Sequence, residues 1–372
     1  MTHRFALVSL LALSLVSCAS SDSLDNTPTP RSRYSGEIGE SPVGVIPEEV
    51  FRDTQRNKDI PFSIHYPTRS GPHPLILFSH GFGGSYRTYV ALTSYWASQG
   101  YVVIAPSHAD SGRRRDVRRA EDIWESQTPA DWRERVRDLT LFLDSLDELE
   151  RRYTELQGKI DRTKVAVGGH SYGAFTAMLI GGTRTFPGAT AYADPRVKAV
   201  LAMSPQGPSD VRGLTAESWN ELRIPALFMT GGMDRGVTET ETPEWRRQAY
   251  ELSPAGDKWL IVLEGARHGS FTGRIEFIEV PRTEQQQLPS VADPNRDPER
   301  DPRLPDERPR ITGTQPGRPG REGMPGLRER GIFAQVKAIS LAFLDTYLRG
   351  DAEGRTALEA AGSRGGVELQ KK

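Results

Sequence analysis

One serine in the chain has neighbours that could make it a nucleophile. Residues 165–178 read VAVGGHSYGAFTAM, in which Ser171 stands between Gly169 and Gly173. A serine hydroxyl attacks a carbonyl carbon only when a base activates it and the adjacent chain leaves room for the carbonyl group. Glycines permit such close approach. The G-x-S-x-G pattern therefore indicates a sharp turn that exposes Ser171, although five residues also match a Gly/Ser turn without catalytic meaning.

A base and an acid for Ser171 are expected further along the chain. In enzymes built on this turn, the order is serine, then aspartate or glutamate, then histidine. His268, in EGARHGSF, is the only histidine after Ser171. Asp234, in the glycine-rich stretch FMTGGMDRGV after an apolar run, is the predicted acid. Asp210 occupies the corresponding place after the preceding run and is the alternative.

The negative charge that develops on the attacked carbonyl oxygen needs two N–H donors. One is the backbone N–H of Tyr172, directly after Ser171. The second is expected from the glycine-rich stretch SHGFGG at residues 79–84, in which the N–H of Phe82 would face the same point. We expect His80 of this stretch to support the loop by hydrogen bonding rather than to carry a proton.

Short apolar runs alternate with segments of helical periodicity along the chain. The apolar runs are residues 75–78, 101–106, 164–169, 197–205, 224–230 and 258–265. The predicted helices include residues 89–99, 130–156 and 333–348. This alternation predicts an α/β fold with a mainly parallel central sheet flanked by helices, and a serine turn directly after one of its strands is the feature expected of the α/β-hydrolase fold. Ser171 directly follows one of the apolar runs, so this context favours the nucleophile over the chance turn.

The first residues of the chain indicate export. MTHRFALVSLLALSLVSCAS has Arg4 before an apolar run at residues 5–16, too short to span a bilayer comfortably and typical of a secretory signal. The run ends in LVSC, which resembles the lipobox of bacterial lipoproteins and implies lipidation of Cys18. We therefore expect a membrane-anchored lipoprotein of the bacterial cell envelope. A plain signal peptide with a chance cysteine is the alternative.

Composition divides the chain into a predicted domain and its additions. Residues 1–18 form the signal peptide, and the polar residues 19–45 a flexible tether. The hydrolase domain is predicted at residues 46–352. It contains a Pro/Arg/Asp-rich insertion at about residues 283–330, which we expect to be a disordered surface loop, with a partner-binding segment as the alternative. Residues 353–372 are predicted to be a C-terminal tail.

Charge and motifs exclude several classes of partner. The formal net charge is −1, so no overall field favours nucleic acid. The basic run GRRRDVRR at residues 112–119 is surrounded by acidic side chains, which favours a solvated loop over a site for nucleic acid or anionic lipid. Cys18 is the only cysteine, so an intrachain disulfide is excluded. No spacing typical of metal ligands, P-loops or dinucleotide sites occurs, so no cofactor and no metal is predicted.

Taken together, SHGFGG, GYVVIAPSHADS, GHSYG, TGGMDRG and ARHGSF make the chain resemble the serine α/β-hydrolases grouped around platelet-activating-factor acetylhydrolase, bacterial polyester hydrolases and dienelactone-hydrolase-like proteins. The resemblance covers about residues 55–275 and the last helix. Dienelactone hydrolases proper use a cysteine where this chain has Ser171. The resemblance implies cofactor-free hydrolysis of a carboxylic ester through an acyl-enzyme, with a short-chain, phospholipid or polyester substrate. A binding or scaffold lipoprotein and a serine peptidase are the alternatives.

Overall fold

The computed structural model describes residues 32–112, 127–186, 191–236, 240–273 and 325–372. The described residues from 33 to 372 belong to one compact unit. The predicted signal peptide, Cys18 and most of the predicted insertion lie outside the described residues, as does the basic run after Gly112.

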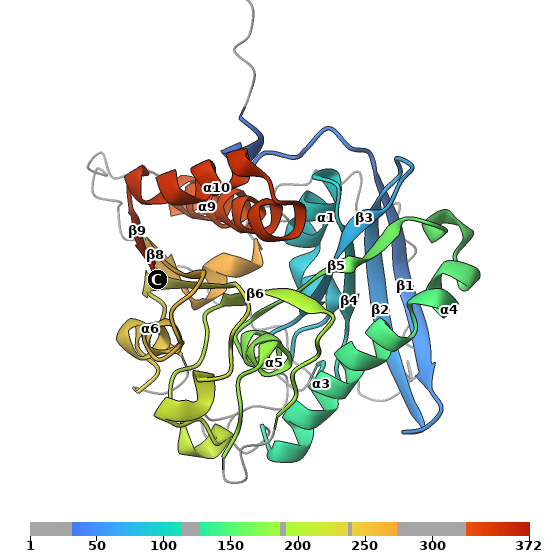
Figure 1. Cartoon of the computed structure of the whole chain (residues 1–372), viewed down its shortest axis with the longest axis horizontal. Helices are drawn as coiled ribbons and strands as arrows, with labels where there is room; N and C mark the ends of the chain where they lie inside the picture. The colour runs from blue at the N-terminus through green and yellow to red at the C-terminus, as the bar shows by residue number, and fades with distance from the viewer. Residues whose placement is uncertain (1–31, 113–126, 187–190, 237–239, 274–324) are drawn as a thin grey trace, which may run out of the picture. The chain divides into compact units, whose positions relative to one another are not determined.

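A single sheet organises the described residues (Figure 1). Its nine strands follow the order β1-β2-β4-β3-β5-β6-β7-β8-β9. The pairs from β4 through β8 are parallel, whereas β1–β2, β2–β4 and β8–β9 are antiparallel. The strands are β1 Val43–Asp53, β2 Lys58–Pro67, β3 His73–Ser79, β4 Val102–Pro106, β5 Ile160–His170, β6 Val197–Met203, β7 Ala226–Met233, β8 Lys258–Arg267 and β9 Val367–Lys371.

Helices cover both faces of this sheet (Figure 1). One face carries α1 Val90–Ser98 and α9 Pro325–Leu344, and α10 Ala352–Glu359 packs on α9. The other carries α3 Pro129–Asp144, α5 Tyr172–Gly181 and α6 Pro243–Glu251. The other helical segments in the described part of the chain are α4 Leu146–Arg152 and the short segments η1 Arg33–Ser35, η2 Tyr86–Tyr89, η4 Thr154–Leu156, η5 Asp210–Arg212, η6 Ala216–Trp219, η7 His268–Thr272, η8 Asp345–Arg349 and η9 Ala360–Ser363.

Each central strand contributes to two hydrophobic cores. In β3, Leu75 and Leu77 pack in the core under α3 and α5, while Ile76 and Phe78 pack in the core under α1 and α9. Alternate strand residues point to opposite faces, so a strand buried on both faces must be apolar throughout. This is why the central strands appear in the sequence as continuous apolar runs, and the prediction of a mainly parallel α/β sheet is confirmed.

The helix predicted at residues 130–156 consists of three segments instead. The side chain of Thr128 accepts a hydrogen bond from the N–H of Asp131, and this capping box starts α3. At Ser145 the backbone leaves helical geometry, with φ −106° and ψ 13°. The chain continues as α4 and then η4. Apolar periodicity continues across Ser145, so the sequence pattern does not mark this break.

The predicted tether is too long at its C-terminal end, because residues 33–45 belong to the folded unit. Tyr34 is 5% exposed, and its hydroxyl lies 3.1 Å from the Asp345 carboxylate and 3.0 Å from that of Asp351. Arg33 forms an ion pair with Asp345 at 2.8 Å. A buried carboxylate such as that of Asp345 needs charged and hydrogen-bonding partners. Arg33 and Tyr34 supply two of these partners.

The prediction of a C-terminal tail at residues 353–372 is wrong. Most of the segment forms α10 and β9, and β9 pairs with β8 so that Val367 lies opposite Leu263 and Leu369 opposite Ile261. The predicted insertion also ends too late, since α9 begins at Pro325. The sequence of β9 is mostly polar and lacks the apolar run by which the other strands were predicted. As an edge strand it is held by its main-chain pairing with β8.

Deleting residues 366–372 is expected to destabilise the protein, because the deletion leaves main-chain groups along β8 without their partners and uncovers part of the core. We expect the melting temperature to fall by about 5 °C or more. Differential scanning calorimetry measures this change. Gln370→Ala, which alters only an exposed side chain of β9, serves as the control and should melt within about 1 °C of the parent. Unchanged melting of the truncated chain would contradict the importance of β9.

Candidate active site

The nucleophile predicted from the sequence lies at a sharp turn between β5 and α5. Ser171 has φ 55° and ψ −122°, a backbone conformation that is strained for any residue other than glycine. A side chain at Gly169 would collide with the carbonyl oxygen of Gly173, and one at Gly173 with the carbonyl oxygen of Ser79. Both glycines are thus required by close backbone packing, which answers why the serine has a glycine two residues to either side.

The structure brings the predicted base and acid to Ser171. His268 begins η7 directly after β8, and its Nε2 lies 2.9 Å from the Ser171 Oγ. Its Nδ1 lies 2.8 Å from Oδ1 of Asp234, which directly follows β7. The three side chains therefore meet at the carboxyl ends of β5, β7 and β8, which are parallel strands of one sheet. They form one continuous hydrogen-bonded relay.

Asp234 is held as a carboxylate by its surroundings. It is fully buried, Arg246 Nε lies 3.1 Å from its Oδ1, and the Thr230 hydroxyl donates to its Oδ2 at 2.9 Å. Burial alone would raise the pKa of the Asp234 carboxyl, but the charge of Arg246 and the hydrogen bond from His268 hold this pKa below its usual value. An ionised Asp234 accepts the Nδ1–H of His268, which leaves Nε2 as the acceptor for the Ser171 hydroxyl.

The alternative acid lies elsewhere. Asp210 begins η5 and is exposed, and among the described residues it is Asp234 that accepts the hydrogen bond from His268 Nδ1. Arg246, which the sequence reasoning did not identify, comes from α6 and also donates to the carbonyl oxygens of Ser204 and Pro205. An arginine within a helix of mixed polarity gives no pattern by which its role could have been found.

The two backbone N–H groups that the sequence suggests for the oxyanion border the site. Tyr172 is the first residue of α5, where helix geometry leaves N–H groups without an acceptor inside the helix. Phe82 lies in the turn that the N–H of Gly84 closes on the carbonyl of Gly81, at 2.9 Å. Both residues line the same cavity as Ser171. Within the described residues, neither N–H donates to a protein acceptor, so both are available for an oxygen atom of a bound molecule.

His80 and His170 shape this loop without belonging to the relay. His80 Nε2 accepts the N–H of His108 at 2.9 Å, and His80 Nδ1 lies 2.7 Å from the carbonyl of Gly81, which agrees with the predicted supporting role. The His170 ring packs on that of His268 with centroids 4.7 Å apart. Its Nδ1 lies 2.8 Å from the hydroxyl of Tyr89, a residue that sequence reasoning missed. Burial lowers the pKa of His170 well below its usual value, which keeps it neutral.

The cavity at Ser171 has a volume of about 850 Å³, and its wall is a mixture of polar and apolar surface. The charged and amide side chains that line it include Arg87, Gln127, Gln206, Arg212, Arg235 and Glu241. Arg212 is buried, and its Nη2 lies 3.0 Å from Gln127 Oε1 and 3.3 Å from Glu241 Oε1. Burial lowers the pKa of the Arg212 guanidinium, and the charge of Glu241 opposes this shift. A molecule bound here meets many hydrogen-bonding groups.

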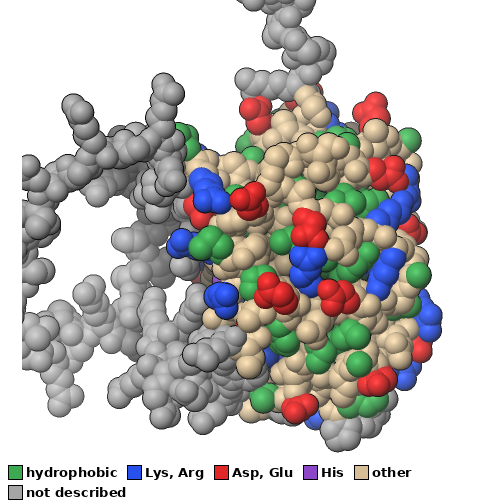
Figure 2. Space-filling model, turned by 90° about the vertical axis from the view of Figure 1, so that its left-hand side faces the viewer, with side chains coloured by type: hydrophobic (Ala, Val, Ile, Leu, Met, Phe, Trp, Pro, Cys, Tyr) green, Lys and Arg blue, Asp and Glu red, His purple; other side chains and the backbone are tan. Residues whose placement is uncertain are grey.

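Other kinds of site find less support in the described part of the chain. No three side chains of His, Cys, Asp or Glu are placed there to hold a metal ion. None of the described helices has the length and apolar character needed to cross a membrane. The face drawn in Figure 2 carries basic and acidic side chains interspersed with single hydrophobic ones, in keeping with the near-zero net charge.

Comparison with known proteins points to ester hydrolases. Residues 37–188 match the family model of chlorophyllase. Platelet-activating factor acetylhydrolase of Cavia porcellus is 25% identical over 242 residues, 57% of this chain and 51% of that protein. The Canis lupus familiaris enzyme is 31% identical over 151 residues, 32% of this chain and 34% of that protein. Chlorophyllase-1 of Arabidopsis thaliana is 34% identical over 70 residues, 19% of this chain and 22% of that protein.

These matches are partial. The chain spans about half the length, or less, of the curated relatives it matches. The family model covers the segment with Phe82, Ser171 and Tyr172 but ends before Asp234 and His268. The hydrogen bonds of His268 to Ser171 and to Asp234 are therefore known from the geometry of this chain and not from the family match.

Proposed function

We propose that this chain, which is similar to chlorophyllase and platelet-activating-factor acetylhydrolase, hydrolyses carboxylic esters with Ser171, His268 and Asp234 as its catalytic triad. One observation carries this proposal. His268 hydrogen bonds to Ser171 through one ring nitrogen and to the buried Asp234 through the other, beside a cavity. This is the arrangement that general-base activation of a serine requires.

In the first half of the reaction, the acyl group moves to the enzyme. Ser171 Oγ attacks the ester carbonyl carbon while His268 Nε2 takes the hydroxyl proton. The carbonyl oxygen becomes an oxyanion, which accepts hydrogen bonds from the N–H groups of Phe82 and Tyr172. When the tetrahedral intermediate collapses, the bond to the alcohol oxygen breaks and His268 gives its proton to that oxygen. The alcohol leaves, and the acyl group remains on Ser171.

In the second half, water releases the acid. His268 removes a proton from a water molecule that attacks the acyl carbon, and the same two N–H groups stabilise the second oxyanion. Collapse breaks the bond to Ser171 Oγ, which recovers its proton from His268. Asp234 keeps its negative charge throughout and stabilises the imidazolium that forms twice in the cycle.

Matched ester and anilide substrates test this function against its alternatives. Purified protein should turn over p-nitrophenyl acetate and leave p-nitroacetanilide essentially intact, because an amine is a poorer leaving group than an alcohol. The release of p-nitrophenol and p-nitroaniline, both measured by absorbance, gives the two rates. Comparable rates would indicate a serine peptidase. Absence of turnover of both substrates would indicate a binding or scaffold protein on this fold.

The charged and amide side chains that line part of the cavity support a short or polar acyl group. Methylene groups placed against Arg212, Gln206 and Glu241 would gain little from leaving water and would interfere with the hydration of these side chains. Among p-nitrophenyl esters of increasing length, we therefore expect the acetate and butyrate to have a larger kcat/KM than the octanoate and palmitate. Short-chain esters, phospholipids with a short acyl group and polyesters remain the candidate substrates.

We also propose that the protein is anchored by lipid at Cys18, which rests on the LVSC motif alone. Cys18→Ala should move the protein from the membrane fraction to the soluble fraction of a bacterial host, since two or more acyl chains are what hold such a protein on a membrane. Immunoblots of the two fractions measure the distribution. Ser21→Ala, outside the motif, is the control. Membrane retention of the Cys18 variant would contradict the anchor.

A further inference from the structure

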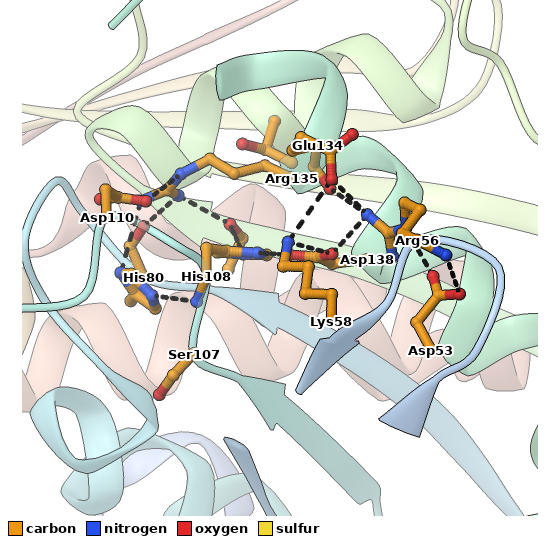
Figure 3. A network of polar contacts seen from close by, with 12 residues as sticks. Asp53, Arg56, Lys58, His80, Ser107, His108, Asp110, Glu134, Arg135 and Asp138 are labelled. Carbon is orange, nitrogen blue, oxygen red and sulfur yellow. Dashed lines mark hydrogen bonds and ion pairs between the residues drawn. The ribbon is translucent and has the colours of Figure 1, made fainter. Parts of the chain in front are cut away.

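Below the loop that carries Phe82, three buried side chains repeat the hydrogen-bond order of the candidate triad. Ser79 Oγ lies 2.9 Å from His108 Nε2, and His108 Nδ1 lies 2.9 Å from Asp138 Oδ2. The serine, both ring nitrogens and the carboxylate thus have the same order as in Ser171, His268 and Asp234. Figure 3 shows His108 and Asp138 within a larger network of polar contacts.

This second relay is enclosed, so it does not serve as a second nucleophilic site. Ser79 and Asp138 are fully buried and His108 is 3% exposed, and none of the three lines the cavity at Ser171. Lys58 Nζ adds two bonds to Asp138, at 2.7 and 2.9 Å. Burial, together with the charge of Arg135, lowers the pKa of His108. A neutral His108 donates from Nδ1 to Asp138 and accepts the Ser79 hydroxyl at Nε2.

Arg135 of α3 connects this relay to the oxyanion loop. Its Nη1 donates to the carbonyl of His80 at 2.7 Å and lies 3.2 Å from Ser79 Oγ. Its Nε and Nη2 donate to the two carboxylate oxygens of Asp110, at 2.9 and 2.7 Å. Arg135 is 1% exposed and Asp110 is 3% exposed, so this two-pronged ion pair is shielded from water (Figure 3).

The cluster of Arg135, Asp110 and His108 forms hydrogen bonds with the loop on both sides of Phe82. Before it, the carbonyl of His80 is held by Arg135 and the His80 ring accepts the N–H of His108. After it, the N–H of Gly83 donates to Asp110 Oδ2 at 2.9 Å. The peptide group between these fixed points contains the N–H of Phe82, whose direction therefore depends on where Arg135 and Asp110 hold the chain.

We propose that the buried Arg135–Asp110 pair, supported by Ser79, His108 and Asp138, positions the N–H of Phe82 for the oxyanion. The proposal rests on the esterase function proposed above. Burying two charges is costly, and a buried ion pair is often no more stabilising than apolar side chains of the same volume. What apolar side chains cannot supply is a set of directed bonds to His80 and Gly83. Arg135 and Asp110 are in this sense positioning residues for catalysis.

Asp110→Asn tests the proposal. An amide has a single acceptor oxygen, so it cannot serve the Gly83 N–H and both prongs of Arg135 at once. We expect kcat for p-nitrophenyl acetate to fall about 10²-fold, at the lower end of the cost of losing one oxyanion donor, while KM changes little. Arg135→Lys is the second variant. It keeps the charge but not the planar fork, and the same loss is expected.

A thionoester separates positioning from general damage. Sulfur in place of the carbonyl oxygen accepts hydrogen bonds poorly, so a well-aligned pair of N–H groups makes an enzyme prefer the oxoester. We expect the ratio of oxoester to thionoester kcat/KM to be large in the parent protein and at least about tenfold smaller in Asp110→Asn. Glu134→Gln, which alters a carboxylate of the same network that pairs with Arg56, is the matched control and should retain the parental ratio.

Each outcome decides one of the two proposals. If the parent protein does not hydrolyse the oxoester, the proposed function itself fails. If the parent hydrolyses it and both variants, folded by circular dichroism, lose activity equally on oxoester and thionoester, the positioning role is wrong and the cluster is only structural. Parental activity in both variants would also overturn the proposal. If Asp110→Asn does not fold, the ratio in Arg135→Lys decides.

Discussion

Ser171→Ala and His268→Ala are each expected to lower kcat for ester hydrolysis by about 10⁶-fold. Without the Ser171 hydroxyl no acyl-enzyme forms. Without the His268 imidazole, the hydroxyl keeps its proton and the alcohol leaves without receiving one. The double variant should be no slower than either single one, because the two residues act as a unit. Initial rates with p-nitrophenyl acetate at saturating concentration measure kcat.

Two controls test whether the loss of activity is specific to the triad residues. Ser209→Ala removes another serine hydroxyl, one outside the cavity, and should leave kcat within a few-fold of the parent. The residual rate of the triad variants should equal that of parent enzyme whose Ser171 has first been blocked with a fluorophosphonate. Equal rates exclude traces of a contaminating serine esterase. Turnover by Ser171→Ala within tenfold of the parent would remove Ser171 from the mechanism.

Asp234→Asn is expected to lower kcat by about 10⁴-fold and to leave KM nearly unchanged. Asparagine fits the space, but its amide can donate a hydrogen bond to His268 Nδ1, which favours the tautomer whose Nε2 carries the proton and cannot accept one from Ser171. Arg246 also loses its buried counter-charge, so the unfolding temperature should fall as well. Steady-state kinetics and thermal melting measure the two effects.

The matched control for this prediction is Asp210→Asn, which makes the same chemical change at the alternative acid. Asp210 is exposed and begins η5, so we expect kcat within a few-fold of the parent and an unchanged melting temperature. If the two variants exchanged these results, Asp210 would be the acid, and the contact between His268 and Asp234 would not reflect the working enzyme.

The sequence predicted the centre of the fold better than its edges. Strands such as β3 and β6 are buried on both faces and so appear as continuous apolar runs, which identify them directly. The edge strand β9 has one buried residue, Val367, and polar neighbours, so its sequence resembles a tail. Tyr34 was missed for a similar reason: one buried aromatic side chain within a polar segment carries no periodicity, and its partner Asp345 lies 311 residues away.

The same contrast applies to the candidate site. Ser171, Asp234 and His268 could be found because each follows an apolar run and chain order distinguishes them from other residues of their type. Their supporting residues could not. Asp110 lies 25 residues before Arg135, and the two meet only because the folded chain brings the segment after β4 to α3. Nothing in the local sequence of either residue indicates an ion pair, so only the folded chain reveals it.

Reaction with a fluorophosphonate tests the central claim most directly, because phosphonylation requires an activated serine with an oxyanion site and does not depend on the natural substrate. Intact-protein mass spectrometry and peptide mapping should find one adduct per chain, on the peptide with Ser171. Labelling should be abolished by Ser171→Ala, strongly slowed by His268→Ala, and absent from Ser79 in the buried relay. A parent protein that stays unlabelled, or one labelled on a different serine, would contradict the account.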